Sequence, residues 1–249
     1  MSRVRAVLRT GAFFGFSAGI LAAYETRRVM TSAPGQTALA NRYRSRLTNG
    51  ILRVFGADLM LHGERARLGG ALVVANHQSA LDIGVMLSVF QGVLVSRHDV
   101  ADWPLLGRLA KHGDTIFVDR EDRRSGALAL REIRRRAKEG RTVVAFPEGR
   151  TFPGDSVHEF HPGAFAAVRA LGIPVLPVGL AYSPAVAYGD ESFGSHIAKI
   201  AARKRTRIAV QLGEPLPDGL DARAAATLAR SRVEALVLEA RRTLDDDPT

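Results

Sequence analysis

The sequence predicts an α/β fold: a single domain with a largely parallel, mixed sheet flanked by helices, preceded by an apolar helical segment at the N-terminus. Short apolar, β-branched runs alternate along the chain with longer helix-like stretches, which is typical of a parallel sheet covered by helices. Polar motifs follow directly after several of these runs, where parallel sheets carry their ligands. The chain of 249 residues, 46% hydrophobic, is long enough to bury one large core.

The N-terminal region, residues 1–55, is predicted to be a helical membrane-docking region, and residues 56–249 the α/β domain. Residues 1–53 hold nine arginines against one acid, Glu25, which gives +8 of the net charge of +10. An uncharged apolar stretch, Thr10 to Tyr24, lies among these arginines. As a helix it is roughly 22 Å long, short of the ~30 Å hydrocarbon core of a bilayer. Basic residues around an apolar stretch favour an anionic lipid surface over a nucleic acid, so we expect an interfacial helix.

Two alternatives for this stretch stay open. A signal peptide also has a basic start and an apolar segment, although "ILAAYETRR" offers a poor cleavage site. An ordinary buried helix is the other alternative. The absence of cysteine excludes a disulfide scaffold, a thiolate nucleophile and a Cys-ligated metal, and fits a cytosolic protein.

The regular elements follow from the apolar pattern. Six apolar, β-branched runs are predicted as strands: 71–75, 92–96, 115–118, 142–146, 173–178 and 206–212. Five stretches are predicted as helices: 81–90, 104–111, 125–139, 163–171 and 222–243. The run "LGIPVLPVGL" contains Pro174 and Pro177, and prolines inside a strand indicate an edge strand or one that faces a ligand.

The stretch "VVANHQSALD" places His77 just after the first predicted strand and Asp82 in the start of the next helix. On one regular helix, side chains five positions apart point about 140° away from each other, so they could not meet. With His77 on the turn and Asp82 in the first helical turn, the carboxylate can reach one ring nitrogen. That bond would fix the tautomer and leave the other nitrogen free as a general base. Alternatively, Asn76 or Ser79 simply caps the helix.

Two further segments end strands in polar residues. In "TVVAFPEGRTFPG", Glu148, Gly149, Arg150 and Thr151 follow an apolar run, where glycine permits close approach of a ligand and arginine can bind a phosphate. In "GDTIFVDRED", Arg120 stands just past a short strand and could hold an anion. Each segment alone is equally compatible with a surface turn.

Taken in order, these segments resemble the glycerolipid acyltransferase family, whose best-known members are the lysophosphatidate acyltransferases. The resemblance spans residues 71 to about 180. Its N-H-x4-D motif is matched by Asn76, His77 and Asp82, and its F-P-E-G motif by residues 146–149. Its G-x-x-F-[IV]-x-R motif is matched at residues 113–120 with one extra residue, and its proline block at residues 173–178.

This resemblance implies transfer of a fatty acyl group from acyl-coenzyme A or acyl-carrier protein, as co-substrate, to the sn-2 hydroxyl of 1-acyl-glycerol-3-phosphate, which gives phosphatidate. His77 would act as the general base and Asp82 would orient it. Asn76, Arg120, Glu148, Gly149, Arg150 and Thr151 would bind substrate. No cofactor, metal or nucleic acid is implied, and backbone N–H groups near Gly149 or at the Asn76–His77 turn are candidate oxyanion donors. The chain has no cysteine nucleophile and no G-x-S-x-G elbow, which fits direct attack by the acceptor hydroxyl.

One departure from the family pattern bears on the acceptor. Where the family has Thr-Arg-Ser after the glycine, this chain has Arg150-Thr151-Phe152. Another lysolipid, such as lyso-ornithine lipid, is therefore the alternative acceptor. A thioesterase or hydrolase, and a non-catalytic basic module, are alternatives of a different class. Because the lipids are membrane residents and the thioesters are cytosolic, we expect a peripheral or monotopic protein on the cytoplasmic face of the cell membrane.

Overall fold

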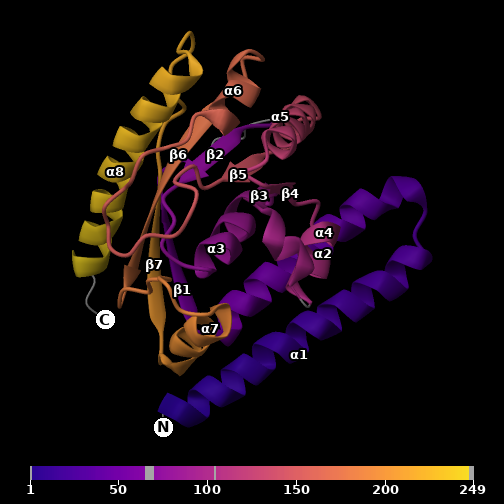
Figure 1. Cartoon of the computed structure of the whole chain (residues 1–249). Helices are drawn as coiled ribbons and strands as arrows, with labels where there is room; N and C mark the ends of the chain where they lie inside the picture. The colour runs from indigo at the N-terminus through magenta and orange to yellow at the C-terminus, as the bar shows by residue number, and fades with distance from the viewer. Residues whose placement is uncertain (1, 65–69, 104, 247–249) are drawn as a thin grey trace.

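The computed structural model describes residues 2–64, 70–103 and 105–246. One seven-stranded sheet forms the centre of the molecule, with helices on both faces (Figure 1). The strands are β1 (Ala57–His62), β2 (Leu72–Ala75), β3 (Val93–Arg97), β4 (Ile116–Val118), β5 (Val143–Ala145), β6 (Val175–Ser183) and β7 (Thr206–Leu212). Their spatial order is β1-β7-β6-β2-β5-β3-β4, and every pair is parallel except β6 with β7. The predicted α/β class with a mostly parallel sheet is confirmed.

The helices form two layers. The helices are α1 (Ser2–Val29), α2 (Ala33–Val54), α3 (Leu81–Phe90), α4 (Leu106–His112), α5 (Arg123–Lys138), α6 (Gly163–Arg169), α7 (Phe193–Ala202) and α8 (Ala222–Asp246), with a 3₁₀ turn at His98–Asp102. In Figure 1, α5, α6 and α8 lie on one side of the sheet, and α1, α2, α3 and α7 on the other. Pro104, where one predicted helix starts, is outside the described residues.

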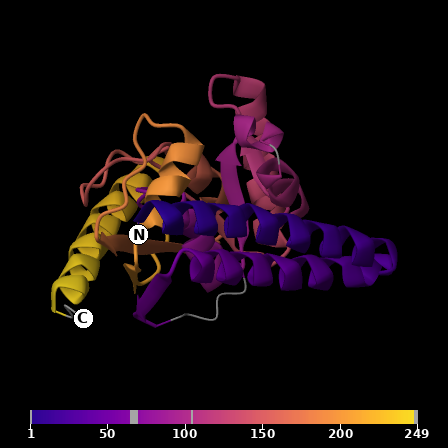
Figure 2. The same ribbon diagram turned by 90° about the horizontal axis from the view of Figure 1, so that it is seen from below.

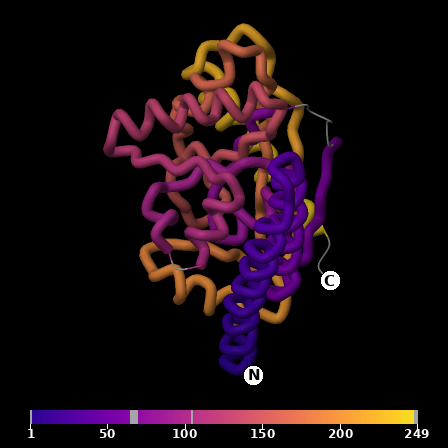
Figure 3. The backbone as a smooth tube through the Cα atoms, turned by 90° about the vertical axis from the view of Figure 1, so that its right-hand side faces the viewer, coloured from indigo at the N-terminus to yellow at the C-terminus, as the bar shows by residue number. Residues whose placement is uncertain are grey.

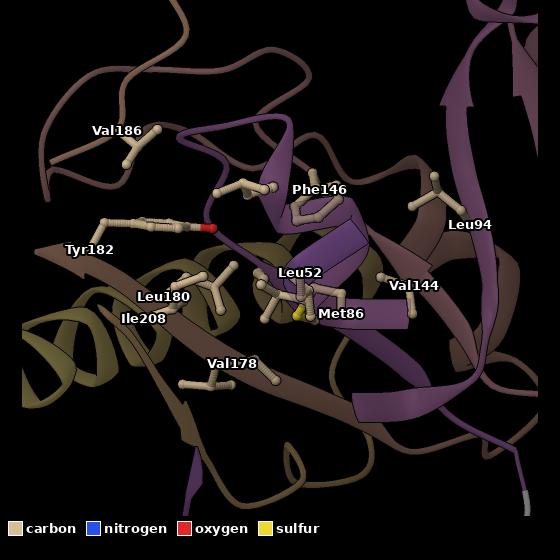
Figure 4. Close-up of a cluster of buried hydrophobic side chains, with 14 of the residues drawn as sticks. Leu52, Met86, Leu94, Val144, Phe146, Val178, Leu180, Tyr182, Val186 and Ile208 are labelled. Atoms are coloured by element: carbon tan, nitrogen blue, oxygen red, sulfur yellow. The ribbon is translucent and has the colours of Figure 1, made fainter. Parts of the chain in front are cut away.

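Each face of the sheet has its own core, because the side chains of a strand alternate. Val73 and Ala75 of β2 join the cluster beneath α2 and α3, whereas Leu72 and Val74 join the cluster beneath α5, α6 and α8. All four residues of β2 are buried, which explains why a central parallel strand reads as one unbroken apolar run. Figure 4 shows the first cluster, with Leu52, Met86, Val144 and Leu180 pointing into it.

The N-terminal apolar helix is longer than the predicted 15-residue stretch. α1 has 28 residues, about 42 Å at the α-helical rise, and is the one helix in the described ranges long and apolar enough to cross a membrane. The length argument against a full span was therefore wrong. α1 and α2 run antiparallel as a hairpin that extends past the sheet (Figures 1 and 2), and the tube view in Figure 3 shows the hairpin on one side of the molecule.

The expectation that the proline-containing run is an edge strand was wrong, and that it faces a ligand stays a prediction. β6 lies inside the sheet, between β7 and β2. The β6–β7 ladder begins at the pair Val178–Leu212, one residue after Pro177. The backbone nitrogen of Pro177 therefore lies outside this ladder, and a proline is tolerated there. The carbonyl of Pro177 accepts from Gly213 N–H, so the missing N–H removes no ladder bond.

Candidate active site

The polar motifs meet at the carboxyl edge of the sheet. His77 follows β2, Arg120 follows β4 and Glu148 follows β5. Because β5 pairs with β2 and with β3, and β3 with β4, these strand ends are neighbours. The fold thus brings together residues that are up to 71 positions apart in the chain.

His77 and Asp82 form a hydrogen-bonded pair. The distance from His77 Nδ1 to Asp82 Oδ2 is 2.7 Å. Since a carboxylate only accepts, Nδ1 carries the ring proton and Nε2 keeps its lone pair. The imidazole stacks on the Phe146 ring, with centroids 4.1 Å apart, and the side chain is 16% exposed toward a cavity. This is the geometry of an oriented general base.

Asp82 is fully buried in the first turn of α3 and is held by four donors. Besides His77, the backbone N–H groups of Gln78 and Ser79 donate to Oδ2 at 2.7 and 2.9 Å. The hydroxyl of Tyr182 donates to Oδ1. The turn before α3 therefore folds around the carboxylate, which explains how a five-residue spacing brings the two side chains together.

Glu148 supports the same turn through its backbone. One carboxylate oxygen accepts from His77 N–H at 2.7 Å and the other from His158 N–H at 2.8 Å. Burial raises the pKa of Glu148 to about 7, against the opposing effect of these two N–H donors. Both oxygens are engaged within the protein, so the contacts of Glu148 position the turn.

The side chain of Asn76 is buried and hydrogen-bonded to the backbone of β6. Its amide nitrogen donates to the carbonyl of Leu180 at 3.0 Å, and its amide oxygen accepts from Leu180 N–H at 2.8 Å. This reciprocal pair joins the end of β2 to the middle of β6. With 2% exposure, Asn76 presents no free polar atom to a ligand in this arrangement.

Arg120 and Gly149 lie against each other. The guanidinium donates to the carbonyl of Gly149, which adopts a positive φ of 90°. The positive φ favours glycine at this position, and a β-carbon there would also displace the Arg120 guanidinium from its contact with the backbone. Burial of the guanidinium lowers the pKa of Arg120, with the charge of Arg97 adding to the effect.

The residues that depart from the family pattern form their own contacts. Arg150 lies over the ring of Phe152, 4.6 Å from its centroid, and that ring stacks on His158. The hydroxyl of Thr151 donates to the carbonyl of Tyr188 at 2.7 Å. Phe152 N–H donates to the carbonyl of His77, so this loop is hydrogen-bonded directly to the turn that carries His77.

A cavity of about 680 Å³ opens beside His77. Its mouth is basic and polar, with Arg97, Arg120 and Arg150 on its wall. Its interior lies between α1, α2, α3 and α4 and is mainly apolar, with Phe13, Ile20, Leu47, Ile51, Leu87 and Leu106 among the lining side chains, although the buried Arg44 of α2 also lines it. The cavity therefore offers an anion-binding entrance, a base at its edge and an apolar interior.

The two expected oxyanion donors are engaged elsewhere. His77 N–H donates to Glu148, and Gly149 N–H donates to the carbonyl of Phe146 at 3.1 Å. In this arrangement neither N–H is free to stabilise a developing oxyanion.

Sequence reasoning missed four residues at this site. Arg97 ends β3 on the cavity wall, and its place after a strand is the same signal that identified Arg120. Tyr182, Tyr188 and His196 contact the catalytic turn from β6, the following loop and α7. No spacing rule links these three to the motifs, because their proximity comes from the packing of elements far along the chain.

The chain is similar to known acyltransferases. The sequence model of the family described as Acyltransferase matches residues 58–181. The lyso-ornithine lipid O-acyltransferase of Pseudomonas aeruginosa is 31% identical over 96% of this chain and 94% of its own length. The 1-acyl-sn-glycerol-3-phosphate acyltransferase of Neisseria gonorrhoeae is 30% identical over 57% of this chain and 58% of its own length.

The fold also has a solved counterpart. The crystal structure of the 1-acyl-sn-glycerophosphate acyltransferase of Thermotoga maritima superposes with a TM-score of 0.77, covering 97% of this chain and 98% of that one, at 20% sequence identity. At this identity the likeness speaks for the fold alone. The family model and the relative that matches over nearly the whole chain show that the protein belongs to the acyltransferase family.

Proposed function

We propose that the protein transfers a fatty acyl group from a thioester donor to the hydroxyl of a lysolipid, with His77 as the general base. The observation that carries this proposal is the His77–Asp82 pair at the edge of a cavity with an apolar interior. Family membership implies a lysolipid acceptor, and the geometry supplies a base for its hydroxyl.

The proposed reaction is one addition and one elimination. The acceptor hydroxyl attacks the thioester carbonyl while its proton moves to His77 Nε2. A C–O bond forms, the C–S bond breaks, and the proton on Nε2 passes to the leaving thiolate sulfur. Asp82 holds Nδ1–H throughout and stabilises the transient imidazolium.

The cavity supports the roles of the two substrates. Its apolar interior suits an acyl chain, and its arginine-lined mouth suits an anionic group. Coenzyme A carries phosphates, as does the prosthetic arm of acyl-carrier protein, so either thioester is compatible with Arg97, Arg120 and Arg150. Both donors are cytosolic, which supports a location on the cytoplasmic face of the membrane.

Lyso-ornithine lipid is the acceptor that we favour. The relative matched over almost the full chain is named for that substrate. An ornithine head group presents one carboxylate and one amine, and so needs less positive charge than a phosphate monoester. Where the family has Thr-Arg-Ser, this chain places the arginine one position earlier and has Phe152 in place of the serine, and the contact of Arg150 with that ring is consistent with a different head group.

Lysophosphatidate is the second candidate. A relative named for that substrate is 30% identical over 57% of the chain, and four arginines line the cavity: Arg44, Arg97, Arg120 and Arg150. A phosphate dianion would be well held by Arg120 and Arg150 together.

A panel of acceptors tests the proposal. Purified protein is incubated with radiolabelled acyl-coenzyme A or acyl-carrier protein and with lyso-ornithine lipid, lysophosphatidate or no acceptor. We expect labelled diacyl product with lyso-ornithine lipid, and less with lysophosphatidate. Product from lysophosphatidate alone would overturn the favoured acceptor. Free fatty acid formed equally with and without acceptor would show a thioesterase, and a protein inert with every combination would contradict acyl transfer.

A further inference from the structure

His196, on α7, is a buried histidine that lies outside both the four sequence motifs and residues 58–181. Its side chain is fully buried, and it contacts the turn that carries the catalytic pair. A buried polar side chain needs partners, so its contacts show what it does.

The ring accepts from the turn at one nitrogen. Ala80 N–H donates to His196 Nε2 at 3.3 Å, and the hydroxyl of Ser79 lies 3.0 Å from the same atom. Because a backbone N–H can only donate, Nε2 is the unprotonated nitrogen and Nδ1 carries the proton. Nδ1 lies 3.3 Å from Glu191 Oε1, close enough for the negative charge to favour a proton on Nδ1, although the two atoms do not have hydrogen-bond geometry.

The turn that His196 holds is the one that surrounds Asp82. Ser79 N–H donates to Asp82 Oδ2 on one side, and the Ser79 hydroxyl meets His196 on the other. The peptide groups at Ser79 and Ala80 are therefore fixed between the catalytic carboxylate and α7. A change at His196 would release the donors that keep Asp82 aimed at His77.

The same ring connects to the wall of the cavity. Tyr188 stacks on His196, with centroids 4.5 Å apart, and its N–H donates to the carbonyl of Gln78. Its carbonyl accepts from Thr151. One histidine thus packs against both the catalytic turn and the loop that lines the cavity.

We propose that His196 is a positioning residue of the His77–Asp82 pair. It accepts hydrogen bonds from Ser79 and Ala80, and so holds the turn in the conformation in which Asp82 contacts His77 beside the cavity. This proposal rests on the acyl transfer proposed above. The order Glu191–His196–Ser79 resembles a hydrolase triad, but Ser79 is fully buried and is absent from the cavity wall, so it is not placed to act as a nucleophile.

The test compares three variants with wild type. His196→Phe keeps an aromatic ring against Tyr188 and removes the acceptor, whereas His196→Gln keeps an acceptor at the end of the side chain. Ser79→Ala removes the hydroxyl and with it both the contact with His196 and the acceptor of Leu81 N–H, so its melting temperature is compared as well. His98→Gln is the matched control, since His98 is 59% exposed and stands outside the cavity wall. The measured quantities are kcat, the KM values of both substrates and the melting temperature.

We expect kcat to fall about 10- to 100-fold in H196F, because a displaced carboxylate misaligns the base, with KM values changed less than about threefold. H196Q should recover most of this loss, S79A should show a smaller fall in kcat, and H98Q should match wild type. If H196F does not fold, the comparison of S79A with H196Q takes its place. A kcat that is lowered in S79A and close to wild type in H196Q supports the proposal.

The contrary results are distinct. Wild-type kcat in H196F or in S79A, in folded protein, overturns the positioning role. Equal losses of kcat in H196F and H196Q, with equal losses of melting temperature, would indicate a packing role and also overturn it. A wild-type protein without acyl transfer to any lysolipid would instead overturn the proposed function.

Discussion

At the scale of the residue, Asp82 is the centre of the site. Its two oxygens collect the ring proton of His77, two backbone N–H groups and the hydroxyl of Tyr182. The carboxylate therefore holds the turn together and also fixes the orientation of the His77 ring, the base in the proposed reaction. A fully buried carboxylate is stable only when its acceptors are filled in this way.

Replacement of Asp82 by Asn tests the charge of the carboxylate. Because Oδ2 accepts from Gln78 N–H and Ser79 N–H as well as from the ring, the amide oxygen of D82N would stay at that position and keep the tautomer, while the negative charge that stabilises the imidazolium is lost. We expect kcat of D82N to fall by about 10²-fold with KM little changed. Steady-state kinetics measure this, with Asp58→Asn, a carboxylate on β1 paired with Arg205, as control. A fall of less than about threefold would contradict the proposed role of this charge.

Glu148 makes stability depend on pH. Its pKa rises from 4.5 to about 7 on folding, so between these values the folded state binds more proton than the unfolded state. Stability then falls as pH rises through this window, by up to about 3 kcal/mol. Urea unfolding at pH values from 5 to 8 should show this slope in wild type and a flatter one in E148Q. Equal slopes in the two proteins would exclude Glu148 as its source.

The sequence identified the residues whose positions are local. His77 and Glu148 follow strands, Asp82 lies in the first turn of the next helix, and the spacing within the turn is enough to bring His77 and Asp82 together. Tyr182 and His196 could not be found in this way, since their contacts with the turn span at least 100 positions of the chain. The oxyanion donors were also not predictable, because the partners of His77 N–H and Gly149 N–H depend on the folded loops.

At the scale of the element, α7 joins the N-terminal helix to the site. Arg5 donates to the carbonyl of Ala202 at the end of α7, and Arg9 donates to the carbonyls of Arg203 and Lys204 just beyond it. These arginines satisfy carbonyl groups that a helix end leaves without partners. The same helix presents His196 to the catalytic turn.

Arg9→Ala tests this connection. Loss of its three carbonyl contacts, including that with Phe55 at 3.1 Å, should lower the free energy of unfolding by about 1–3 kcal/mol. Chemical denaturation measures the change. Arg3→Ala is the control because Arg3 is exposed and has no hydrogen bond within the described ranges. If both variants lose the same stability, these contacts do not carry the attachment of α1.

Two elements, β1 and α7, were not predicted, for different reasons. β1 is only half-buried, and it gains its place by parallel pairing with β7, nearly 150 positions away. α7 has a signal that could have been used, since Ser192 caps it by accepting from Ser195 N–H and its apolar residues recur at helical spacing. The prediction that β6 is an edge strand was wrong because a proline in the sequence does not show at which residue pairing with the neighbouring strand begins.

At the scale of the molecule, the cavity lies between the helical hairpin and the sheet. α1 and α2 supply part of its apolar wall, while the strands supply the base and the basic mouth. The division of the chain near residue 55 stays a prediction. The alternation of apolar runs was enough to predict the α/β class. It does not show that β7 pairs antiparallel with β6, because that depends on which strands meet in the folded sheet.

Exposed apolar residues on α1 test membrane docking. Val4, Val7 and Leu8 are 63%, 72% and 66% exposed, and arginines flank them. We expect wild type to bind vesicles that contain anionic lipid, and the triple change of these residues to Ser to weaken binding about 10- to 100-fold.

Vesicle sedimentation measures the partitioning. The control changes Leu128 and Leu238 to Ser, which are 52% and 51% exposed on α5 and α8. Equal binding by the triple variant and wild type would contradict docking through α1.

The most direct test of the account is the initial rate of acyl transfer to a lysolipid by His77→Ala. We expect a folded protein with the melting temperature of wild type within a few degrees and a rate about 10²- to 10⁴-fold lower, because the acceptor hydroxyl loses its base. A folded variant that retains more than about one tenth of the wild-type rate would contradict the proposal that His77 Nε2 takes the hydroxyl proton.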